Sequence, residues 1–403
     1  MTAENGSTGS AQVVEFRREI RQMLQGRLSE AVEALFEEEL EGVLGSGWYE
    51  RSERRRGYRN GAIRRRVTTA AGTRELKVPR ARLTSSGGDT SEFRSELLPR
   101  YARRTHQIDE AILGIYLAGA NSRRIRKALE PLLGEENLSR SAVSRVVGRL
   151  KNLFDQWRSR DLSQERYGVM FLDGFHLKVR MARRVIAVPV LAALGVGQDG
   201  RKVLLALQLA PSESSAQWGH LLEDLQKRGL AAPLLIVVDG GSGLNKALIT
   251  WKGVKVQRCV VHKLRNLHDH CPVHARAEMT RDYNRIVYAR DGLAAREAHE
   301  AFLKKWSVLS PAVARSLEEA REELLTYYEF PRSMWKSLRT TNALENLNRE
   351  FRRRTKTQAS FATEQAALRL LYALVAFEQI NLRKIDGYRD LARLMQGASS
   401  EAA

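Results

Sequence analysis

Short apolar runs rich in β-branched residues recur between residues 167 and 261, and their order is the feature that most constrains the fold. Such runs predict buried strands when turn-forming or polar residues bound them. The predicted strands are Tyr167–Phe171, His176–Arg180, Val185–Leu194, Lys202–Leu209, Leu234–Val238 and Val254–Val261. Helical spacing over Ser214–Arg228 and Leu244–Trp251 separates the later strands. With the two short runs on either side of Asp173 counted together, the order is β-β-β-α-β-α-β, which predicts an α/β fold with a mixed sheet and helices on its faces.

Two aspartates stand at strand ends in this predicted sheet. Asp173 closes the first strand and Asp239 closes the fourth. These strands are neighbours in the predicted order, so both carboxylates emerge at one edge. An acid is a poor core residue, because an unpaired buried charge costs several kcal/mol. Mg²⁺ prefers a few carboxylates with water and substrate oxygens, and two such ions can hold a phosphodiester. The pair predicts a Mg²⁺ site, with each aspartate as a plain turn former as the alternative.

Glu345 is the third candidate ligand. It lies on a strongly basic helix that is predicted to begin at Thr341 and to continue past Leu371. Its position borders the apolar face of that helix. Two structural explanations stay open, an i,i+4 ion pair with Arg349 and a capping box with Asn342.

The charge balance indicates a polyanionic partner. The chain of 403 residues carries 67 Lys and Arg against 47 Asp and Glu, a formal net charge of +20. Cations that neutralise phosphates release counterions, which favours binding. A basic surface that serves solubility alone is the alternative. Two cysteines, and an N-terminus without a basic and apolar leader, predict a soluble protein of the cytoplasm.

Three regions precede the predicted sheet. Residues 1–50 are acidic with apolar positions at helical spacing, which predicts an amphipathic helix that packs within the chain or on another subunit. Residues 51–106 are strongly basic and alternate like a small β unit that lies along DNA, or like a solvated hairpin. Residues 107–155 have helix-turn-helix character, with Arg145 and Arg149 on the polar face of the last helix. A plain helical bundle is the alternative for this region.

Basic residues near the three acids are predicted to contact DNA phosphates. They follow Asp173, flank a Cys-x₂-His unit, or form a run on the Glu345 helix: Lys178, Arg180, Arg258, Lys263, Arg265, Arg349, Arg352, Arg353, Arg354 and Lys356. Trp335 is the aromatic candidate for stacking a flipped base, with core packing as the alternative.

Two Cys-x₂-His units lie close together in the chain, Cys259 with His262 and Cys271 with His274. Four such side chains suit a tetrahedral zinc ion. Structural packing combined with DNA contact is the favoured interpretation, and zinc is not expected.

The chain resembles the Mutator-type (IS256-like) bacterial transposases, which are RNase H-like enzymes of the DD(E/D) class. The resemblance lies in FLDGFHLKVR, VVDGGSGLNKAL, QRCVVHKLRNL and RTTNALENLNREFRRRTK, and upstream in YRNG and VPRAR. It implies that Asp173, Asp239 and Glu345 form the catalytic triad. It also implies that Cys259 and His262 belong to the family's C-x₂-H signature, which is thought to shape the site or handle flipped bases.

The same resemblance implies an RNase H-like core over residues 160–262 and 336–385, interrupted by an all-helical insertion at residues 263–335. The predicted function is a DNA transposase that binds the terminal inverted repeats of an insertion sequence as a dimer or larger assembly on double-stranded DNA. Water, and then a DNA 3′-hydroxyl, would attack phosphodiesters with two Mg²⁺ ions, or with Mn²⁺ in their place. An RNase H-like nuclease or resolvase without strand transfer, or a catalytically silent DNA-binding regulator, are the alternatives.

Overall fold

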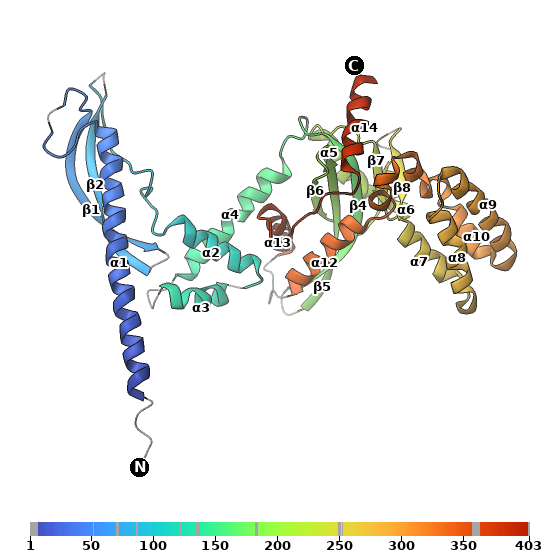
Figure 1. The fold of residues 1–403 in the computed structure, drawn as a ribbon, viewed down its shortest axis with the longest axis horizontal. Coiled ribbons are helices and arrows are strands. Elements are labelled where there is room, and N and C mark those ends of the chain that lie inside the picture. The colour runs from blue at the N-terminus through green and yellow to red at the C-terminus, as the bar shows by residue number, and fades with distance from the viewer. Residues whose placement is uncertain are drawn as a thin grey trace, which may run out of the picture. The chain divides into compact units, whose positions relative to one another are not determined.

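The computed structural model forms two compact units that meet in the sequence between Gly148 and Arg149 (Figure 1). Each unit is described by itself. The structure describes residues 7–50, 52–69, 72–85, 88–120, 122–133, 138–181, 184–248, 251, 253–356 and 363–401. No helix among these residues is both long and apolar enough to cross a membrane.

The first unit begins with a long helix that packs on a small antiparallel sheet. The helix is α1 (Ser7–Leu44), and the strands, in the order β1-β2-β3, are β1 (Gly57–Thr69), β2 (Gly72–Thr84) and β3 (Thr90–Glu92). Phe36 of α1 packs against Val67 and Leu76 of the sheet, and Leu40 and Leu44 pack on Ala81. Figure 1 shows the C-terminal half of α1 lying along β1 and β2.

The acids of α1 bind the basic sheet of the same unit. Arg59 contacts Glu37 Oε2 (2.5 Å) and Glu41 Oε1 (3.1 Å), and Glu33 Oε1 accepts a hydrogen bond from the backbone N–H of Lys77 (2.8 Å). The amphipathic helix predicted for residues 1–50 therefore has a partner within its own chain. Part of the positive charge predicted for DNA contact is neutralised there.

Three helices complete the first unit and share one apolar cluster. They are α2 (His106–Leu117), α3 (Ser122–Leu133) and α4 (Arg140–Arg158). The cluster joins Ile108 and Ile112 to Ile125 and to Val143 and Val146. The region predicted to have helix-turn-helix character thus contains three packed helices, of which α4 continues to Arg158, past the unit boundary. Helix-turn-helix function stays a prediction.

A five-stranded mixed sheet forms the centre of the second unit. Its order is β6-β5-β4-β7-β8, antiparallel from β6 to β4 and parallel from β4 through β7 to β8. The strands are β4 (Tyr167–Met181), β5 (Arg184–Gly197), β6 (Lys202–Leu209), β7 (Leu235–Val238) and β8 (Lys255–Arg258). With α5 and α6 between the last strands, the chain has the predicted β-β-β-α-β-α-β order and an α/β fold.

Helices cover both faces of this sheet, because successive side chains of a strand point to opposite faces. Met170 and Leu172 of β4 share a core with Trp218 of α5 (Ser215–Lys227) and Leu244 of α6 (Ser242–Ala247). On the opposite face, the ring centroid of Phe175 lies 6.0 Å from that of Phe351 on α12.

The C-terminal helices of the second unit are α12 (Asn342–Lys356), α13 (Glu364–Ala376) and α14 (Tyr388–Glu401). The single helix predicted from Thr341 past Leu371 is therefore two helices, and residues 357–362 lie outside the described part of the chain. α14 packs directly on the backbone of β4, since a Cβ at Gly168 would lie 2.5 Å from Leu391 Cδ1.

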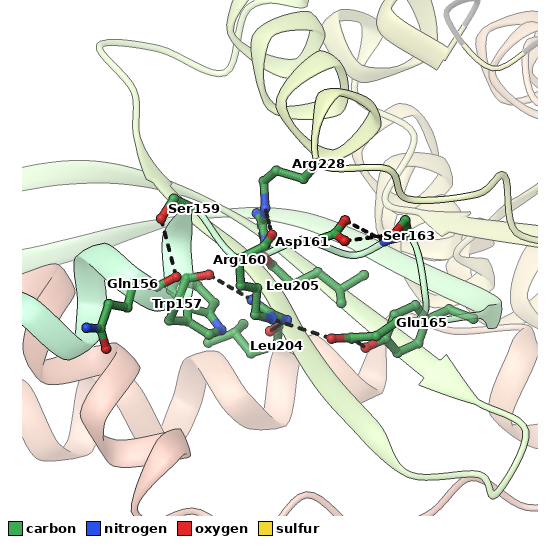
Figure 2. A network of polar contacts seen from close by, with 11 residues as sticks. Gln156, Trp157, Ser159, Arg160, Asp161, Ser163, Glu165, Leu204, Leu205 and Arg228 are labelled. Atoms are coloured by element: carbon green, nitrogen blue, oxygen red, sulfur yellow. Dashed lines mark hydrogen bonds and ion pairs between the residues drawn. The ribbon is translucent and has the colours of Figure 1, made fainter.

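Two arginines fix the connection from α4 to β4 (Figure 2). Arg160 donates to the carbonyl oxygens of Trp157 (3.1 Å) and Leu204 (3.3 Å), the second of which lies on β6. The buried Arg228, which follows α5, donates to Arg160 O (3.0 Å) and Leu205 O (3.3 Å). Figure 2 shows both guanidinium groups directed at backbone carbonyls, so these cations serve the fold.

A helical segment lies between β8 and α12, as predicted for residues 263–335. It comprises α7 (Val260–His270), α8 (Arg276–Val287), α9 (Gly292–Leu309), α10 (Pro311–Glu318) and α11 (Trp335–Leu338), with 3₁₀ turns at Val273–Ala275, Arg321–Leu324, Thr326–Glu329 and Arg332–Met334. The strand predicted to reach Val261 ends at Arg258, and Val260 already belongs to α7. Apolar residues at positions 260 and 261 suit either element, because a short apolar run does not distinguish a strand from a buried helix.

Candidate active site

Asp173 lies within β4 rather than at a strand end. β4 continues through it, since Asp173 pairs with Ala192 and Gly174 with Leu191 on β5. The two strands predicted on either side of Asp173 are thus one strand. The parallel pairing of β4 with β7, however, ends at Leu172 and Val238. Asp173 and Asp239 therefore both follow the last paired residues of neighbouring parallel strands, and they meet at one sheet edge.

The carboxylate of Asp173 is buried, with 6% of the residue exposed. Asn348 Nδ2 on α12 donates to Asp173 Oδ2 (2.9 Å). Burial, and next the charge of Asp239, raise the pKa of Asp173 to about 7, with smaller contributions from Glu345 and Glu213. These influences show that several carboxylates converge on this point, which is the environment that a divalent cation would neutralise.

Asp239 occupies the turn that leaves β7. Its Oδ1 accepts a hydrogen bond from the backbone N–H of Gly241 (3.0 Å). Gly240 between them has a φ of +93°, and a Cβ there would lie 2.4 Å from Arg258 Nε. Only glycine suits a left-handed position that a guanidinium covers so closely. Arg258 Nη2 donates to Gly240 O (2.9 Å), which fixes the turn beside Asp239.

Glu345 comes to the same site from the first turns of α12. Its Oε1 lies 3.5 Å from His262 Nε2 in the first turn of α7, and His262 Nδ1 lies 3.4 Å from Thr341 Oγ1. The buried Cys259 Sγ accepts from the backbone N–H of Thr341 (3.4 Å). The start of α12 is thus joined to the start of α7, which positions Glu345.

Cys259 and His262 change each other's protonation. Burial raises the pKa of the Cys259 thiol, but hydrogen bonds from His262 and Thr341 outweigh burial and hold this pKa below its ordinary value. The hydrogen bond with Cys259 raises the pKa of His262 against the opposing effect of burial, and Glu345 and Asp173 add to the rise. When His262 is protonated, its Nε2 forms an ion pair with Glu345 Oε1 at 3.5 Å.

The residues present fit a divalent cation. Asp173, Glu345 and His262 line a single hollow, together with Asn348 and the exposed Arg265. No Lys or Arg among the residues that the structure describes forms an ion pair with Asp173, Asp239 or Glu345. Hard oxygen ligands without a cationic partner are the donor set that Mg²⁺ and Mn²⁺ take.

The two Cys-x₂-His units do not form one cluster. Within the described part of the chain, the potential ligand atoms of Cys259, His262 and Glu345 lie within 4.8 Å of one another, and Cys271 and His274 do not belong to this group. Cys271 Sγ instead contacts Pro272 O at 3.6 Å. Within the described residues, Cys271 and His274 therefore supply no ligands to the group formed by Cys259, His262 and Glu345.

Two cations predicted to contact DNA are buried structural residues, which corrects that prediction. Arg258 and Lys263 each have side chains only 2% exposed, and both bind Glu319, just after α10. Arg258 Nη1 lies 3.1 Å from Glu319 Oε1 and Lys263 Nζ 2.8 Å from Glu319 Oε2, with Ser316 O as a further acceptor for Lys263. Cys259 is likewise buried, so none of the three offers a surface to DNA.

The other predicted contacts lie mostly on the surface. The exposed ones are Arg145, Arg149, Lys178, Arg265, Arg349, Arg352, Arg353 and Lys356. Arg353 pairs with Glu350 (2.6 Å), and the half-buried Arg354 donates to Gln379 O (3.4 Å). The side chain of Arg180 lies outside the described residues. Trp335 is half-buried and packs edge-on against Tyr328, with its indole N–H donating to Phe330 O (2.7 Å), a core role.

Asn348 and Glu319 are the site residues that the sequence did not reveal. Asn348 follows Leu344 by one helical turn and so falls on the buried face of α12. A polar residue on an otherwise apolar face was the available signal. Glu319 carries no such signal, because its partners lie 56 and 61 residues away in the chain.

The fold and the site define a mixed α/β protein with a carboxylate cluster at one edge of its sheet. The family model described as "Transposase, Mutator family" matches residues 1–383, and the chain belongs to this family. It is 32% identical over 402 residues to the transposase for insertion sequence element ISRM5 of Rhizobium meliloti (strain 1021), with 98% of each chain covered.

Further relatives have similar names. The chain is 32% identical over 370 residues to the transposase for insertion sequence element IS905 of Lactococcus lactis subsp. lactis (strain IL1403), with 91% of each chain covered. It is 31% identical over 331 residues to the transposase for insertion sequence element IS256 in transposon Tn4001 of Staphylococcus aureus, with 81% of this chain and 82% of the relative covered.

Proposed function

We propose that this protein is a DDE transposase with an RNase H-like core, which cleaves DNA at the ends of an insertion sequence and joins those ends to a target. The observation that carries the proposal is that the charges of Asp239 and Glu345 both act on Asp173, with the three acids supplied by two neighbouring strands and one helix. The full-length match to the Mutator family agrees with it. Its place of action is the cytoplasm, on nucleoid DNA.

Asp173, Asp239 and Glu345 would hold the divalent cations, two Mg²⁺ or Mn²⁺ in their place. Bound there, the metal supplies charge neutralisation at the phosphate and activation of the attacking oxygen. The protein contributes position: the sheet edge sets the distance between the two aspartates, and α12 brings Glu345 to them. In each step one P–O bond forms to water or to a DNA 3′-hydroxyl, and the P–O bond to the leaving oxygen breaks.

The DNA path in the second unit follows α12. The hollow at the acids shares Arg352 with a second hollow lined by Lys178 and Lys356, and shares Arg349 with a third lined by Lys336, Arg383 and Lys384. Shared walls make one trough with basic residues on both sides of the acids. Fifteen residues of α12 span about 22 Å, enough for several consecutive phosphates.

The first unit would bind the terminal inverted repeats. The exposed Arg64, Lys77 and Arg82 on β1 and β2, and Arg145 on α4, are surface cations of this unit that could contact phosphates, and Arg149 follows on α4 just past the unit boundary. Because two element ends are joined in one reaction, a homodimer or larger assembly on double-stranded DNA is the working form.

A strand-transfer assay tests this function. The full chain is incubated with Mg²⁺, target DNA and a duplex that ends as a pre-cleaved inverted repeat, and joined products are expected. Cleavage without joining would overturn the proposal in favour of a nuclease or resolvase. Sequence-specific binding with neither cleavage nor joining would overturn it in favour of a DNA-binding regulator.

A further inference from the structure

Asn348 stands directly behind the proposed catalytic acids and has no role assigned by the triad. The residue is buried, 3% exposed, on the face of α12 that packs against β4. Its Nδ2 donates to Asp173 Oδ2 over 2.9 Å, joining residues 175 positions apart. We propose that Asn348 is a positioning residue, which holds one oxygen of Asp173 so that the other is presented to a divalent cation. This inference rests on the proposed function.

The chemistry of the site favours an amide at this position. Asp173 lies among the negative charges of Asp239, Glu345 and Glu213. A Lys or Arg would orient the carboxylate, but it would also supply the charge that the metal must supply, and so compete with it. An amide N–H donates a hydrogen bond without adding a charge. Outer hydrogen bonds of this kind orient metal-binding carboxylates, and their loss costs about 10–100-fold in metal affinity.

The other half of the Asn348 amide points away from a purely structural role. Asn348 Oδ1 is buried and has no hydrogen-bond partner among the described residues. An unsatisfied buried acceptor costs about 1–3 kcal/mol, and an apolar side chain of the same shape removes that cost. Leucine would remove this cost but would also take the donor from the buried Asp173 Oδ2, so the two effects on stability oppose each other and the fold alone does not require an amide. The orientation with Nδ2 toward Asp173 follows from the carboxylate, which accepts hydrogen bonds when ionised.

One helix carries both the proposed ligand and its support. Glu345 and Asn348 are three residues apart, so they lie on one side of α12. Contacts of Thr341 with Cys259 and of Phe351 with Phe175 fix α12 at both ends of this stretch. The docking of α12 therefore sets the position of Glu345 and the orientation of Asp173 together.

The variant Asn348→Leu tests the inference, because leucine keeps the branched shape and removes both polar atoms. Three properties of the purified full chain are measured: thermal unfolding without metal, Mn²⁺ affinity by electron paramagnetic resonance, and the cleavage rate on element-end DNA. We expect a Tm within a few degrees of wild type, Mn²⁺ affinity reduced at least about tenfold, and cleavage reduced at least about tenfold with DNA affinity retained. Unchanged Mn²⁺ affinity and cleavage rate in a folded variant would overturn the inference.

A matched control comes from the same helix. Thr355 is also buried, and its hydroxyl donates to Phe351 O (2.9 Å), away from the acids. Thr355→Val removes one buried polar group from α12, and should leave Mn²⁺ affinity and cleavage within about twofold. If Asn348→Leu does not fold, Asn348→Ala carries the same expectations for Mn²⁺ affinity and cleavage, with a lower Tm because of the cavity that alanine leaves.

Asp173→Asn separates this inference from the proposed function. If Asp173→Asn cleaves DNA at the normal rate, the proposed function fails. If Asp173→Asn is inactive while Asn348→Leu retains normal Mn²⁺ affinity and cleavage, only the inference about Asn348 fails.

Discussion

Two carboxylate sites lie near Gly240 and differ in their partners. One is the single carboxylate of Glu319, and the other is the cluster of Asp173, Asp239 and Glu345. On one side, Glu319 binds Arg258 and Lys263, two cations that are themselves buried. On the other side, no Lys or Arg of the described residues forms an ion pair with Asp173, Asp239 or Glu345. Arg258 links the two sites. It binds the carboxylate of Glu319, and it also donates to the backbone carbonyl of Gly240, the residue after Asp239.

The difference separates structure from chemistry. At Glu319 the opposite charges are already matched, and the hydrogen bonds from Lys263 and Arg258 hold the pKa of Glu319 below its ordinary range although burial opposes them. At Asp173 burial, and next the like charge of Asp239, raise the pKa to about 7 although His262 opposes the rise, and no Lys or Arg of the described residues pairs with the carboxylate. The ion pairs of Glu319 with Arg258 and Lys263 hold the helical insertion to the sheet. The three acids have no Lys or Arg partner among the described residues, so a divalent cation can bind there.

The largest expected effect is the loss of chemistry at the unmatched cluster. Asp173→Asn, Asp239→Asn and Glu345→Gln each keep the side-chain shape and remove a metal-binding charge. Cleavage and strand transfer should fall on the order of a thousandfold or more in single-turnover assays. Binding of element-end DNA, measured by anisotropy, should stay within about threefold. A variant that keeps wild-type turnover would remove that residue from the cluster.

The second largest effect is expected in the pH dependence of stability, when Asp173→Asn is compared with wild type. Asp173 has a pKa near 3.9 in the unfolded chain and about 7 when folded. Between these values the unfolded state loses its proton first, so metal-free wild-type protein loses stability as pH rises from about 4 to about 7. Asp173→Asn lacks this loss, and its advantage over wild type should grow across that window and then level off.

Thermal unfolding at a series of pH values measures this gap. Saturating Mg²⁺ should narrow it, because the cation stabilises the ionised carboxylate of the wild type alone. A gap that is constant from pH 5 to pH 8 would contradict the raised pKa of Asp173.

A smaller effect is expected from the matched cluster. Glu319→Gln leaves Arg258 and Lys263 buried with one charged partner fewer, and should lower the free energy of unfolding by about 2 kcal/mol. The value is below that for a fully buried pair because the Glu319 side chain is 58% exposed. Urea unfolding measures it.

Glu329→Gln is the matched control for Glu319. It breaks a contact of similar length, 2.6 Å to Lys255, but both of these side chains are about half exposed. The expected loss is below about 0.5 kcal/mol. Equal losses for the two variants would remove the distinction between the buried and the exposed pair.

The smallest effect concerns exposed cations along the trough. Lys178→Ala combined with Lys356→Ala should weaken binding of element-end DNA several-fold, and should reduce the slope of log affinity against log salt by about 2. Lys227→Ala removes an exposed cation from α5, which covers the opposite face of the sheet, and should leave the slope unchanged. An unchanged slope in the double variant would exclude both lysines from the DNA path.

The sequence predicted the sheet well because its strands are apolar runs whose order restricts the topology. It placed Asp173 at a strand end because the apolar run before it stops there, yet pairing with β5 carries the strand past Asp173 and Gly174. Local pattern cannot reveal such pairing, which depends on a strand that follows later in the chain.

Charged residues were harder to interpret than apolar ones. Arg258 and Lys263 were predicted to contact phosphates because they flank the Cys-x₂-His unit near the acids. Nothing near them in the chain indicates that Glu319 is their partner. The apolar positions Leu344, Leu347 and Phe351 gave the buried face of α12 directly, whereas Asn348 on that face required the structure to show what it binds. Partner choice across long sequence distances is set by tertiary packing, which a residue pattern does not encode.

The bond between Asn348 and Asp173 also has a consequence for protein synthesis. A growing chain releases both aspartates from the ribosome long before it releases α12, since the bonded residues are 175 positions apart. On the proposed chemistry, a nascent or prematurely terminated chain that ends before Asn342 holds two acids but neither Glu345 nor the amide that orients Asp173. On that chemistry, the site is complete only once α12 has left the ribosome, close to the end of translation.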